Sequence, residues 1–243
     1  MKSISIIMPC YNYEKLIIKK VNKLIKKIKL YKLKYQIIII DDCSNDNTFK
    51  KLKENFSSKK NIVIVKNPIN SGKSYSIRRG LKISKHNYVI LIDCDLTYFE
   101  KVDHIIKLLK KNIDFVAVNR RLKTSKLVNK TFSLYQFIRH FIGQFISQVI
   151  KNLLKLNIEA CDTQAGLKGF KKIPILKRTK FISNRFFFDL ELFFLFINQN
   201  RKIHFIPVKY EISKDSSIKI FDIKNFLIIF ELYKVILKCR SLK

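Results

Sequence analysis

The sequence predicts an α/β protein in which helices cover both faces of a mostly parallel central sheet. Three observations support this prediction. Strand-like and helix-like segments alternate through the first half of the chain, an order typical of parallel sheets. The strand-like segments are continuously apolar, as expected for strands that are buried on both faces. Polar and acidic residues follow directly after these segments, at the points where the strands would end.

Residue patterns define each element of the first half in order. Segments 4–8, 35–40, 61–65, 88–92 and 115–118 are short, apolar and rich in β-branched residues, which favours strands. Segments 14–33, 48–56, 74–84 and 100–111 are expected to be helices. In the first of these, Ile17, Val21, Leu24 and Ile28 recur at helical spacing among lysines. Segments 132–150 and 226–237 are expected to be amphipathic helices, because charged residues interrupt their apolar runs.

Length and composition exclude several classes of protein. A chain of 243 residues that is 47% hydrophobic can bury a sizeable core, which excludes disordered, collagen-like and disulfide-scaffold classes. The five cysteines lie far apart and form no CxxC pair, so we expect reduced thiols in the cytoplasm rather than structural zinc. The opening residues lack the pattern of a secretory signal. No apolar run reaches the ~20 uninterrupted residues of a membrane span.

The charge of the chain is strongly positive. Lys and Arg together number 50 and Asp and Glu 18, which gives a net charge of +32. Such a surface attracts polyanions, either anionic lipid headgroups or nucleic acid. A general compositional bias toward Lys, Ile, Asn and Phe explains the charge equally well. The choice of partner must therefore come from motifs.

Acidic residues are concentrated at two expected strand ends, Asp41-Asp42 and Asp93-Cys94-Asp95. In parallel sheets, ligands bind beyond the carboxyl ends of the strands. Two carboxylates after one strand suit Mg²⁺ or Mn²⁺, which bridge to phosphate oxygens. Acidic turn or N-cap residues would be the ordinary alternative. Two such pairs in so basic a chain favour a ligand site.

The segment Gly72-Lys73-Ser74 resembles the end of a phosphate-binding P-loop. The P-loop pattern requires glycine five positions earlier, and that position is Asn67. We therefore reject a P-loop. Gly72 still permits a tight entry into the next helix, and Lys73 near the start of that helix is an expected anion contact.

Seven segments in order resemble the motifs of inverting family 2 glycosyltransferases, which have the GT-A fold. These segments are 7–12, 39–46, 70–73, 93–96, 162–170, 188–191 and 206–208. The fifth and sixth resemble the polyprenyl-phosphate branch of that family, which includes dolichol-phosphate mannose and glucose synthases. We therefore expect a GT-A domain over residues 1–215, followed by a C-terminal amphipathic helical segment over 216–243.

The resemblance implies roles for individual residues. Those expected to bind the nucleotide-sugar are Pro9, Tyr11, Asn12, Glu14, Asp41, Asp42, Lys73, Asp93, Asp95, Arg120 and Lys219. Those expected to hold Mg²⁺ or Mn²⁺ are Asp93, Asp95 and Thr97. Those expected to act in catalysis are Asp93, Asp95, Asp189 and Glu191, and those expected to bind the acceptor are Arg139, Gln164 and Lys168.

Four departures from the family pattern bear on the site. The family has Glu directly after Tyr-Asn, whereas here Tyr13 intervenes before Glu14, which leaves either residue to face the nucleotide. Cys43 stands where the family has glycine, so this turn must either avoid positive φ or tolerate strain. Thr97 replaces a common glutamine and is a weaker ligand. The family's Ser-Lys near the C-terminus becomes Ser216-Ser217-Ile218-Lys219, and either Lys219 or Lys214 would take over the diphosphate contact.

The expected reaction moves a hexose from a donor of the GDP-mannose or UDP-glucose type to polyprenyl phosphate at the cytoplasmic face of a membrane. A phosphate nucleophile is already anionic, so it needs in-line placement rather than a strong base. The two amphipathic helices would bind an anionic membrane surface, unless they pack internally.

Two alternatives remain open from the sequence. A glycan or lipid hydroxyl as acceptor would make Asp189 or Glu191 an obligatory base. A basic nucleic-acid-binding domain would leave the acidic strand ends unexplained, and the chain has no recognition-helix, zinc or RNP signature. We therefore expect no nucleic acid partner.

Overall fold

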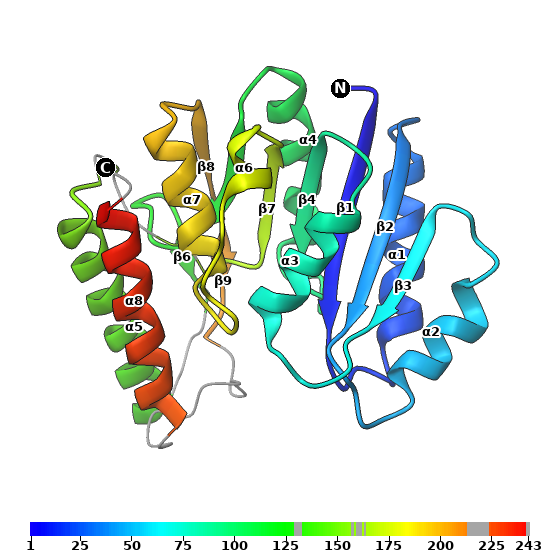
Figure 1. The fold of residues 1–243 in the computed structure, drawn as a ribbon, viewed down its shortest axis with the longest axis horizontal. Coiled ribbons are helices and arrows are strands. Elements are labelled where there is room, and N and C mark those ends of the chain that lie inside the picture. The colour runs from blue at the N-terminus through cyan, green and yellow to red at the C-terminus, as the bar shows by residue number, and fades with distance from the viewer. Residues whose placement is uncertain (129–132, 157, 159–161, 163, 213–223, 242–243) are drawn as a thin grey trace.

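The computed structural model describes residues 1–128, 133–156, 158, 162, 164–212 and 224–241. Strands and helices alternate through the first half in the predicted order (Figure 1). They are β1 (Ser3–Cys10), α1 (Ile17–Lys29), β2 (Lys34–Asp41), α2 (Thr48–Phe56), β3 (Ile62–Lys66), α3 (Lys73–Ile83), β4 (Tyr88–Ile92), the 3-10 turn η1 (Phe99–Lys101), α4 (Val102–Lys110) and β5 (Phe115–Asn119). Each predicted element is present, with ends that shift by a few residues. The predicted α/β class is confirmed.

The second half adds four strands and four helices among the described residues, and two of these helices are the longest that the described residues form. These elements are β6 (Lys126–Leu127), α5 (Leu134–Leu153), β7 (Leu167–Lys171), α6 (Ile175–Arg178), α7 (Phe188–Asn198), β8 (Ile203–Pro207), β9 (Lys209–Tyr210) and α8 (Lys224–Ser241). Of these, the sequence predicted α5 and α8 as amphipathic helices. The predicted domain boundary between residues 215 and 216 falls outside the described residues, so it stays a prediction.

The main sheet has seven strands in the order β3-β2-β1-β4-β7-β5-β8. Only β7 runs antiparallel to its neighbours, and the other pairs are parallel. Ile92, at the carboxyl end of β4, therefore pairs with Leu167, at the start of β7. The segment that precedes β7 consequently reaches the same edge of the sheet as the segments that follow β1, β2 and β4.

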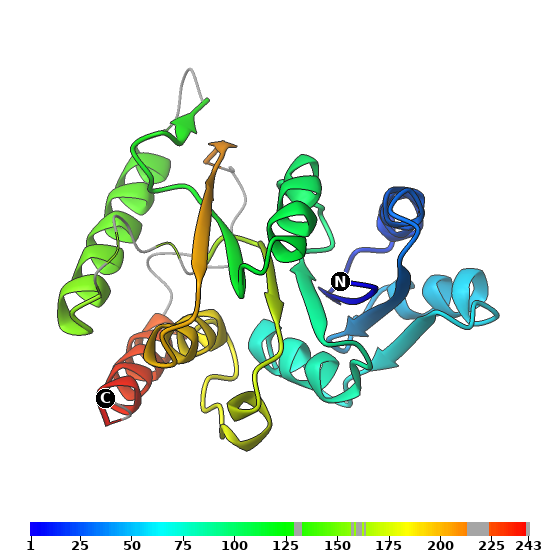
Figure 2. The same cartoon turned by 90° about the horizontal axis from the view of Figure 1, so that it is seen from above.

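Two hydrophobic clusters lie on the two faces of this sheet. Alternate residues of β1 divide between them: Ile4 and Ile6 pack with α1, α2 and α4, whereas Ile7 packs with α3 and α7. Figure 2 shows the sheet between α1 and α4 on one side and α3 and α7 on the other. Helix α7 is buried from Phe188 to Phe196, as expected for a helix that is mostly apolar all round, and its two buried acids, Asp189 and Glu191, are both ion-paired.

Helices α5 and α8 lie at the end of the molecule opposite β3 (Figure 1). They contact each other where Arg240 Nε donates a hydrogen bond to the Leu153 carbonyl oxygen at 3.2 Å. Val235, Ile236 and Cys239 of α8 are buried in the same cluster as α7. Among the helices formed by described residues, none has the length and apolarity needed to cross a membrane.

Candidate active site

The carboxyl ends of β1, β2 and β4 form one edge of the sheet, here called the rim. Cys10 at the end of β1 pairs with Asp41 at the end of β2. On its other side, β1 pairs with β4, which ends one residue before Asp93. The acidic pairs 41–42 and 93–95 therefore lie at the same edge, as the sequence predicted.

The turns after β1 and β2 are joined by hydrogen bonds. The Asn12 amide donates to Ser44 Oγ at 2.9 Å, and the Asn45 amide donates to Asn12 Oδ1 at 2.9 Å. The fully buried Asp41 accepts from the amide of Ser44 at 3.1 Å. Asp41 therefore holds this turn together, and its predicted contact with the nucleotide stays a prediction. Tyr11 is exposed beside Asn45, with its hydroxyl 3.5 Å from Asn45 Nδ2.

Glu14 lies in the turn between β1 and α1 and contacts the start of α2. Its carboxylate accepts from the Asn47 amide at 3.1 Å and pairs with Lys51 Nζ at 3.0 Å. The hydrogen bond with Lys51, followed by those with Asn47, lowers the pKa of Glu14. Pro9 is buried within β1 opposite Ile40. The structure thus gives both residues local structural contacts, and their predicted binding of nucleotide is untested.

Asp42 fixes the segment that leads into α3. Its Oδ1 accepts from Asn67 Nδ2 at 2.7 Å and from the Ser71 amide at 3.0 Å, and its Oδ2 accepts from the Gly72 amide at 2.8 Å. A carboxylate has about four acceptor sites, so three are filled from within the protein. The predicted hydrogen bond to the base or ribose would have to use the remaining one.

Lys73, the first residue of α3, forms an ion pair with Asp93. Their Nζ and Oδ1 atoms are 2.6 Å apart, and about a third of each side chain is exposed. Burial lowers the pKa of Lys73, but the carboxylates of Asp93, Asp189 and Asp95 outweigh burial and raise it overall. A Cβ atom on Gly166 would lie 2.2 Å from Asp93 Oδ2. Glycine at 166 therefore lets the Asp93 carboxylate pass directly against the backbone.

Asp95 is exposed two residues beyond Asp93. Its Oδ1 accepts from the Thr97 amide at 2.8 Å, and its carbonyl oxygen accepts from Lys20 Nζ at 2.6 Å. Thr97 thus contacts Asp95 through its backbone amide. Sequence reasoning missed Lys20, which carries no motif signal and comes from α1.

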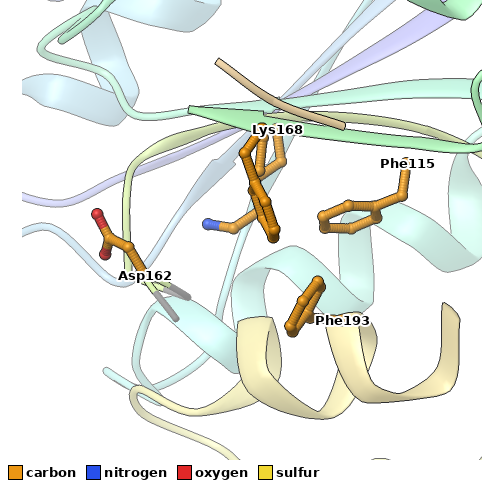
Figure 3. A pocket seen from close by; sticks show the side chains of 6 residues that line it. Phe115, Asp162, Lys168 and Phe193 are labelled. Carbon is orange, nitrogen blue, oxygen red and sulfur yellow. The ribbon is translucent and has the colours of Figure 1, made fainter. Parts of the chain in front are cut away.

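A second ion pair lies behind the first one, buried inside the protein. Lys168 Nζ is 3.3 Å from Asp189 Oδ1, and both side chains are almost fully buried. Burial lowers the pKa of Lys168, although Asp189 opposes this shift. Lys168 also lines a small pocket together with Phe115 and Phe193. In Figure 3 the ammonium group of Lys168 points away from Phe115. In this structure Lys168 is not presented at the surface, so its predicted contact with an acceptor stays a prediction.

Arg120 follows β5 and forms an ion pair with Asp162. Its Nε and Nη2 atoms donate to the two carboxylate oxygens at 2.8 Å each, and its amide donates to Oδ2 at 2.9 Å. Burial raises the pKa of Asp162, but the hydrogen bonds and charge of Arg120 outweigh burial and lower it to about 2. Two of the five guanidinium N–H groups are used in this way. The sequence identified Asp162 only as part of a motif, because its partner lies 42 residues away.

Glu191 is turned toward α8, where it pairs with Lys238, and its predicted catalytic role stays a prediction. It is buried and accepts from the Ser183 amide at 2.9 Å, from the Ile182 amide at 3.1 Å and from Lys238 Nζ at 2.8 Å. These contacts give it a structural function, because they hold a loop and a helix together. Its position two residues after Asp189 in a helix separates the two side chains, since neighbours on one helix face are three or four residues apart.

The remaining predicted residues are scattered. Gln164 is exposed and donates from Nε2 to the Phe186 carbonyl oxygen at 3.0 Å. Arg139 lies on α5, but its side chain is not among those described. Lys219, with the alternative Lys214, lies outside the described residues. The structure therefore brings together Lys73, Asp93, Asp95, Lys168 and Asp189 as one group of opposite charges.

An α/β sheet of this order, with paired carboxylates at the rim, defines the GT-A class of fold. Glucosyl-3-phosphoglycerate synthase from Mycobacterium tuberculosis, crystallised with Mn²⁺ and uridine-diphosphate-glucose, shares the fold. Its TM-score is 0.65 at 14% identity, over 96% of this chain and 79% of that chain. A mannosyltransferase from Pyrobaculum calidifontis, in complex with GDP-Man and Mn²⁺, gives a TM-score of 0.56 at 14% identity, over 84% of this chain and 55% of that one.

The chain belongs to glycosyl transferase family 2, whose model matches residues 5–167. Dolichyl-phosphate beta-glucosyltransferase of Dictyostelium discoideum is 28% identical over 222 residues, covering 85% of this chain and 66% of that protein. Dolichol-phosphate mannosyltransferase of Pyrococcus furiosus is 29% identical over 132 residues, covering 53% and 36%. The family predicted from the motifs is thus confirmed. The chain spans 52–66% of the length of the first curated relatives that it matches.

Proposed function

We propose that the protein transfers a hexose, with inversion, from a nucleotide-sugar to polyprenyl phosphate at the cytoplasmic face of a membrane. The observation that carries this proposal is the link between the two acidic strand ends. Gly72 is held by Asp42, and the next residue, Lys73, pairs with Asp93. At the rim, the start of α3 therefore connects the Asp42 carboxylate, which holds Gly72, with the Asp93 carboxylate, which pairs with Lys73. This arrangement supports a site for a nucleoside diphosphate.

The donor would lie along this rim. Lys73 and Arg120 supply positive charge for the diphosphate, which gains negative charge as the sugar leaves. Cations that stabilise this charge more in the transition state than in the ground state increase the rate. Relatives with glucosyltransferase and mannosyltransferase names support a donor of the UDP-glucose or GDP-mannose type.

The rim fits a divalent cation. Asp93 and Asp95 offer hard carboxylate oxygens, and Gly166 leaves the Asp93 carboxylate unobstructed by a side chain. Among the described residues no three His, Cys, Asp or Glu side chains gather into a complete metal site, but Mg²⁺ is commonly held by one or two carboxylates with water and substrate phosphates. Bound Mg²⁺ or Mn²⁺ would neutralise charge on the leaving diphosphate. Asp93 and Asp95 would hold it, with Thr97 as a weaker third ligand.

A phosphate acceptor suits the environment of Asp189. This carboxylate is buried and paired with Lys168, so taking a proton from an incoming hydroxyl would break an internal ion pair. A polyprenyl phosphate needs no such base, because its nucleophilic oxygen is already anionic. The names of the dolichyl-phosphate relatives support the same acceptor class.

The outer face of α5 supports binding to a lipid surface. An exposed apolar stripe runs along this helix at helical spacing: Leu134, Phe137, Ile138, Phe141, Ile142, Phe145 and Ile146. Four further exposed apolar residues lie on α8: Ile229, Phe230, Tyr233 and Leu237. Exposed apolar stripes of this kind are typical of helices that lie in a membrane interface, and the net charge of +32 adds attraction to anionic lipids.

A transfer assay tests this proposal. The chain is incubated with Mn²⁺ and radiolabelled UDP-glucose or GDP-mannose, and with either polyprenyl phosphate or polyprenol in mixed micelles. We expect labelled lipid with polyprenyl phosphate alone. Equal labelling of polyprenol would instead support a hydroxyl acceptor, and no labelling with either donor would reject the proposed donor class.

A pair of variants tests the rim. Asp95→Asn should lose Mn²⁺-dependent transfer with little change in unfolding free energy, because an exposed carboxylate adds little packing. The control is Asp114→Asn, which precedes β5 at the opposite edge of the sheet and accepts from the Lys202 amide. It should keep full activity. Full Mn²⁺-dependent activity in Asp95→Asn would contradict the assignment.

A further inference from the structure

Glu231 of α8 makes an unusual contact with the loop of residues 183–185. Its Oε1 atom accepts three hydrogen bonds, from Ser183 Oγ at 2.6 Å, the Asn184 amide at 2.8 Å and the Arg185 amide at 3.0 Å. Hydrogen bonds to a carboxylate are about twice as strong as those between neutral groups. One side chain of the C-terminal helix therefore fixes the backbone of a loop that comes about 46 residues earlier in the chain.

The same loop closes the N-terminus of α3. The first amides of a helix have no partner within the helix, and α3 has no side-chain cap. The Ser74 amide donates to the Arg185 carbonyl oxygen at 3.2 Å, and the Tyr75 amide donates to the Asn184 carbonyl oxygen at 2.9 Å. Gly72 has φ +95°, and a Cβ there would lie 3.0 Å from Arg185 Cα. The loop is thus in direct contact with the start of α3.

The first residue of α3 is Lys73, which pairs with Asp93 at the rim. A continuous series of hydrogen bonds and one ion pair therefore runs from α8 to the candidate donor site. We propose that Glu231 is a positioning residue for this site: by holding loop 183–185, it fixes the start of α3 and hence the place of Lys73 against Asp93. The last step rests on the proposed function, because it takes the Lys73–Asp93 pair to be where the donor diphosphate binds.

A second contact of α8 supports this role. Lys238, two turns after Glu231, pairs with Glu191, and Glu191 accepts from the amides of Ile182 and Ser183. Ser183 is fully buried, and its hydroxyl also accepts from the Phe187 amide at 2.8 Å. Helix α8 therefore holds both the start of the loop and its centre. The alternative is that these contacts merely attach α8 to the rest of the protein.

Hydrogen exchange distinguishes the two possibilities. Glu231→Ala is compared with Lys234→Gln, which removes one charge from an exposed position of the same helix. We expect Glu231→Ala to speed exchange about tenfold both in residues 183–187 and in residues 72–76, since networks of this kind carry couplings of a few-fold to tens-fold. Exchange in α1 should not change. Lys234→Gln should leave both segments as in the wild type.

Binding of UDP and GDP with Mn²⁺, measured by calorimetry, gives the functional readout. Glu231→Ala should weaken it about tenfold, and Glu231→Gln less, because its amide oxygen still accepts. Faster exchange in 183–187 with unchanged exchange in 72–76 and unchanged affinity would show that Glu231 only attaches α8. If Glu231→Ala does not fold, Glu231→Gln carries the same comparison at smaller amplitude. If the wild type binds neither nucleotide, the proposed function fails, while exchange in 72–76 still decides whether the coupling exists.

Discussion

Replacing Gly166 by alanine is expected to disable the rim without unfolding the protein. The added Cβ would lie 2.2 Å from Asp93 Oδ2 and 2.9 Å from Asp93 Cγ, whereas real Cβ contacts essentially never fall under 3.0 Å. The carboxylate must therefore move by about 1 Å. A misplacement of about 1 Å in a catalytic constellation can cost about 100-fold in rate, which corresponds to about 2.7 kcal/mol of transition-state stabilisation.

The cost to stability should be small. The Asp93 side chain is 30% exposed, so it can rotate toward solvent rather than into the core. The backbone at 166 has no positive φ, so alanine adds no strain of its own. We expect a change of about 0.5 kcal/mol or less in the free energy of unfolding, the range of ordinary surface changes.

Gly169→Ala, three residues further along, is the matched control. A Cβ there would lie 2.3 Å from Ile105 Cγ2, between β7 and α4 in the core. Overpacking of this kind costs about 1–3 kcal/mol, but it leaves Asp93 untouched. Transfer rates with Mn²⁺ at 20 °C and urea unfolding are measured for both variants. An active Gly166→Ala protein, or one as destabilised as Gly169→Ala, would refute the assignment of Asp93.

Three further predictions concern other parts of the molecule. The pKa of Asp162 lies near 2 in the folded protein, below its ordinary value. Its contribution to the free energy of unfolding is therefore complete above about pH 4 and is lost as the pH falls toward 2. Urea unfolding at a series of pH values should show that this free energy falls by about 2 kcal/mol over this range, and that this fall is absent in Asp162→Asn. Cys43 has φ 61°, so Cys43→Gly should raise the unfolding free energy by up to about 1 kcal/mol, and a decrease would contradict strain there. Replacing Phe141 and Phe145 of α5 together by serine should weaken sedimentation with anionic vesicles without lowering the melting temperature, since both are more than 60% exposed; a lower melting temperature with unchanged binding would mean that they pack internally.

The sequence predicted the first half of the fold well because its signals are local. Each strand from β1 to β5 is a short apolar run that ends in a polar turn, and the apolar stripe of α1 matches its buried residues, from Ile17 to Ile28. In the second half, the sequence predicted α5 and α8 but missed β7, β8 and α7. Strand β7 carries two lysines and a glycine among its five residues, and α7 is buried from Phe188 to Phe196, so neither shows the periodicity that separates a strand from a helix. The antiparallel direction of β7 likewise has no local signal.

The sequence predicted where the site lies, but it did not predict the contacts that each side chain makes there. The motifs predicted that Asp42, Asp93 and Lys73 lie at the same edge of the sheet. They did not reveal that Asp42 holds the entry to α3 or that Lys168 is buried beside Asp189. These tasks depend on contacts between residues far apart in the chain. A motif identifies a residue type at a place in a family, whereas burial and hydrogen bonding follow only from the assembled fold.

Backbone strain gives independent support for the rim. Eight non-glycine residues among those described have positive φ. Four of them follow the ends of α1, α4, α5 and α7, where a left-handed residue is a common way to end a helix.

The other four are Asn12, Cys43, Leu96 and Tyr98, in the turns after β1, β2 and β4. No helix end explains Asn12, Cys43 or Leu96. Asparagine adopts this conformation readily, but for residues such as Cys43 and Leu96 it costs about 1–3 kcal/mol and persists only where the surrounding structure holds it. The turns of Asn12 and Cys43 are held by the bonds that join Asn12 to Ser44 and Asn45, and the Leu96 amide donates to the Asp93 carbonyl oxygen at 2.9 Å. Strain that is kept in place on three adjacent strands at one edge is typical of a ligand site, and this argument uses no resemblance to other proteins.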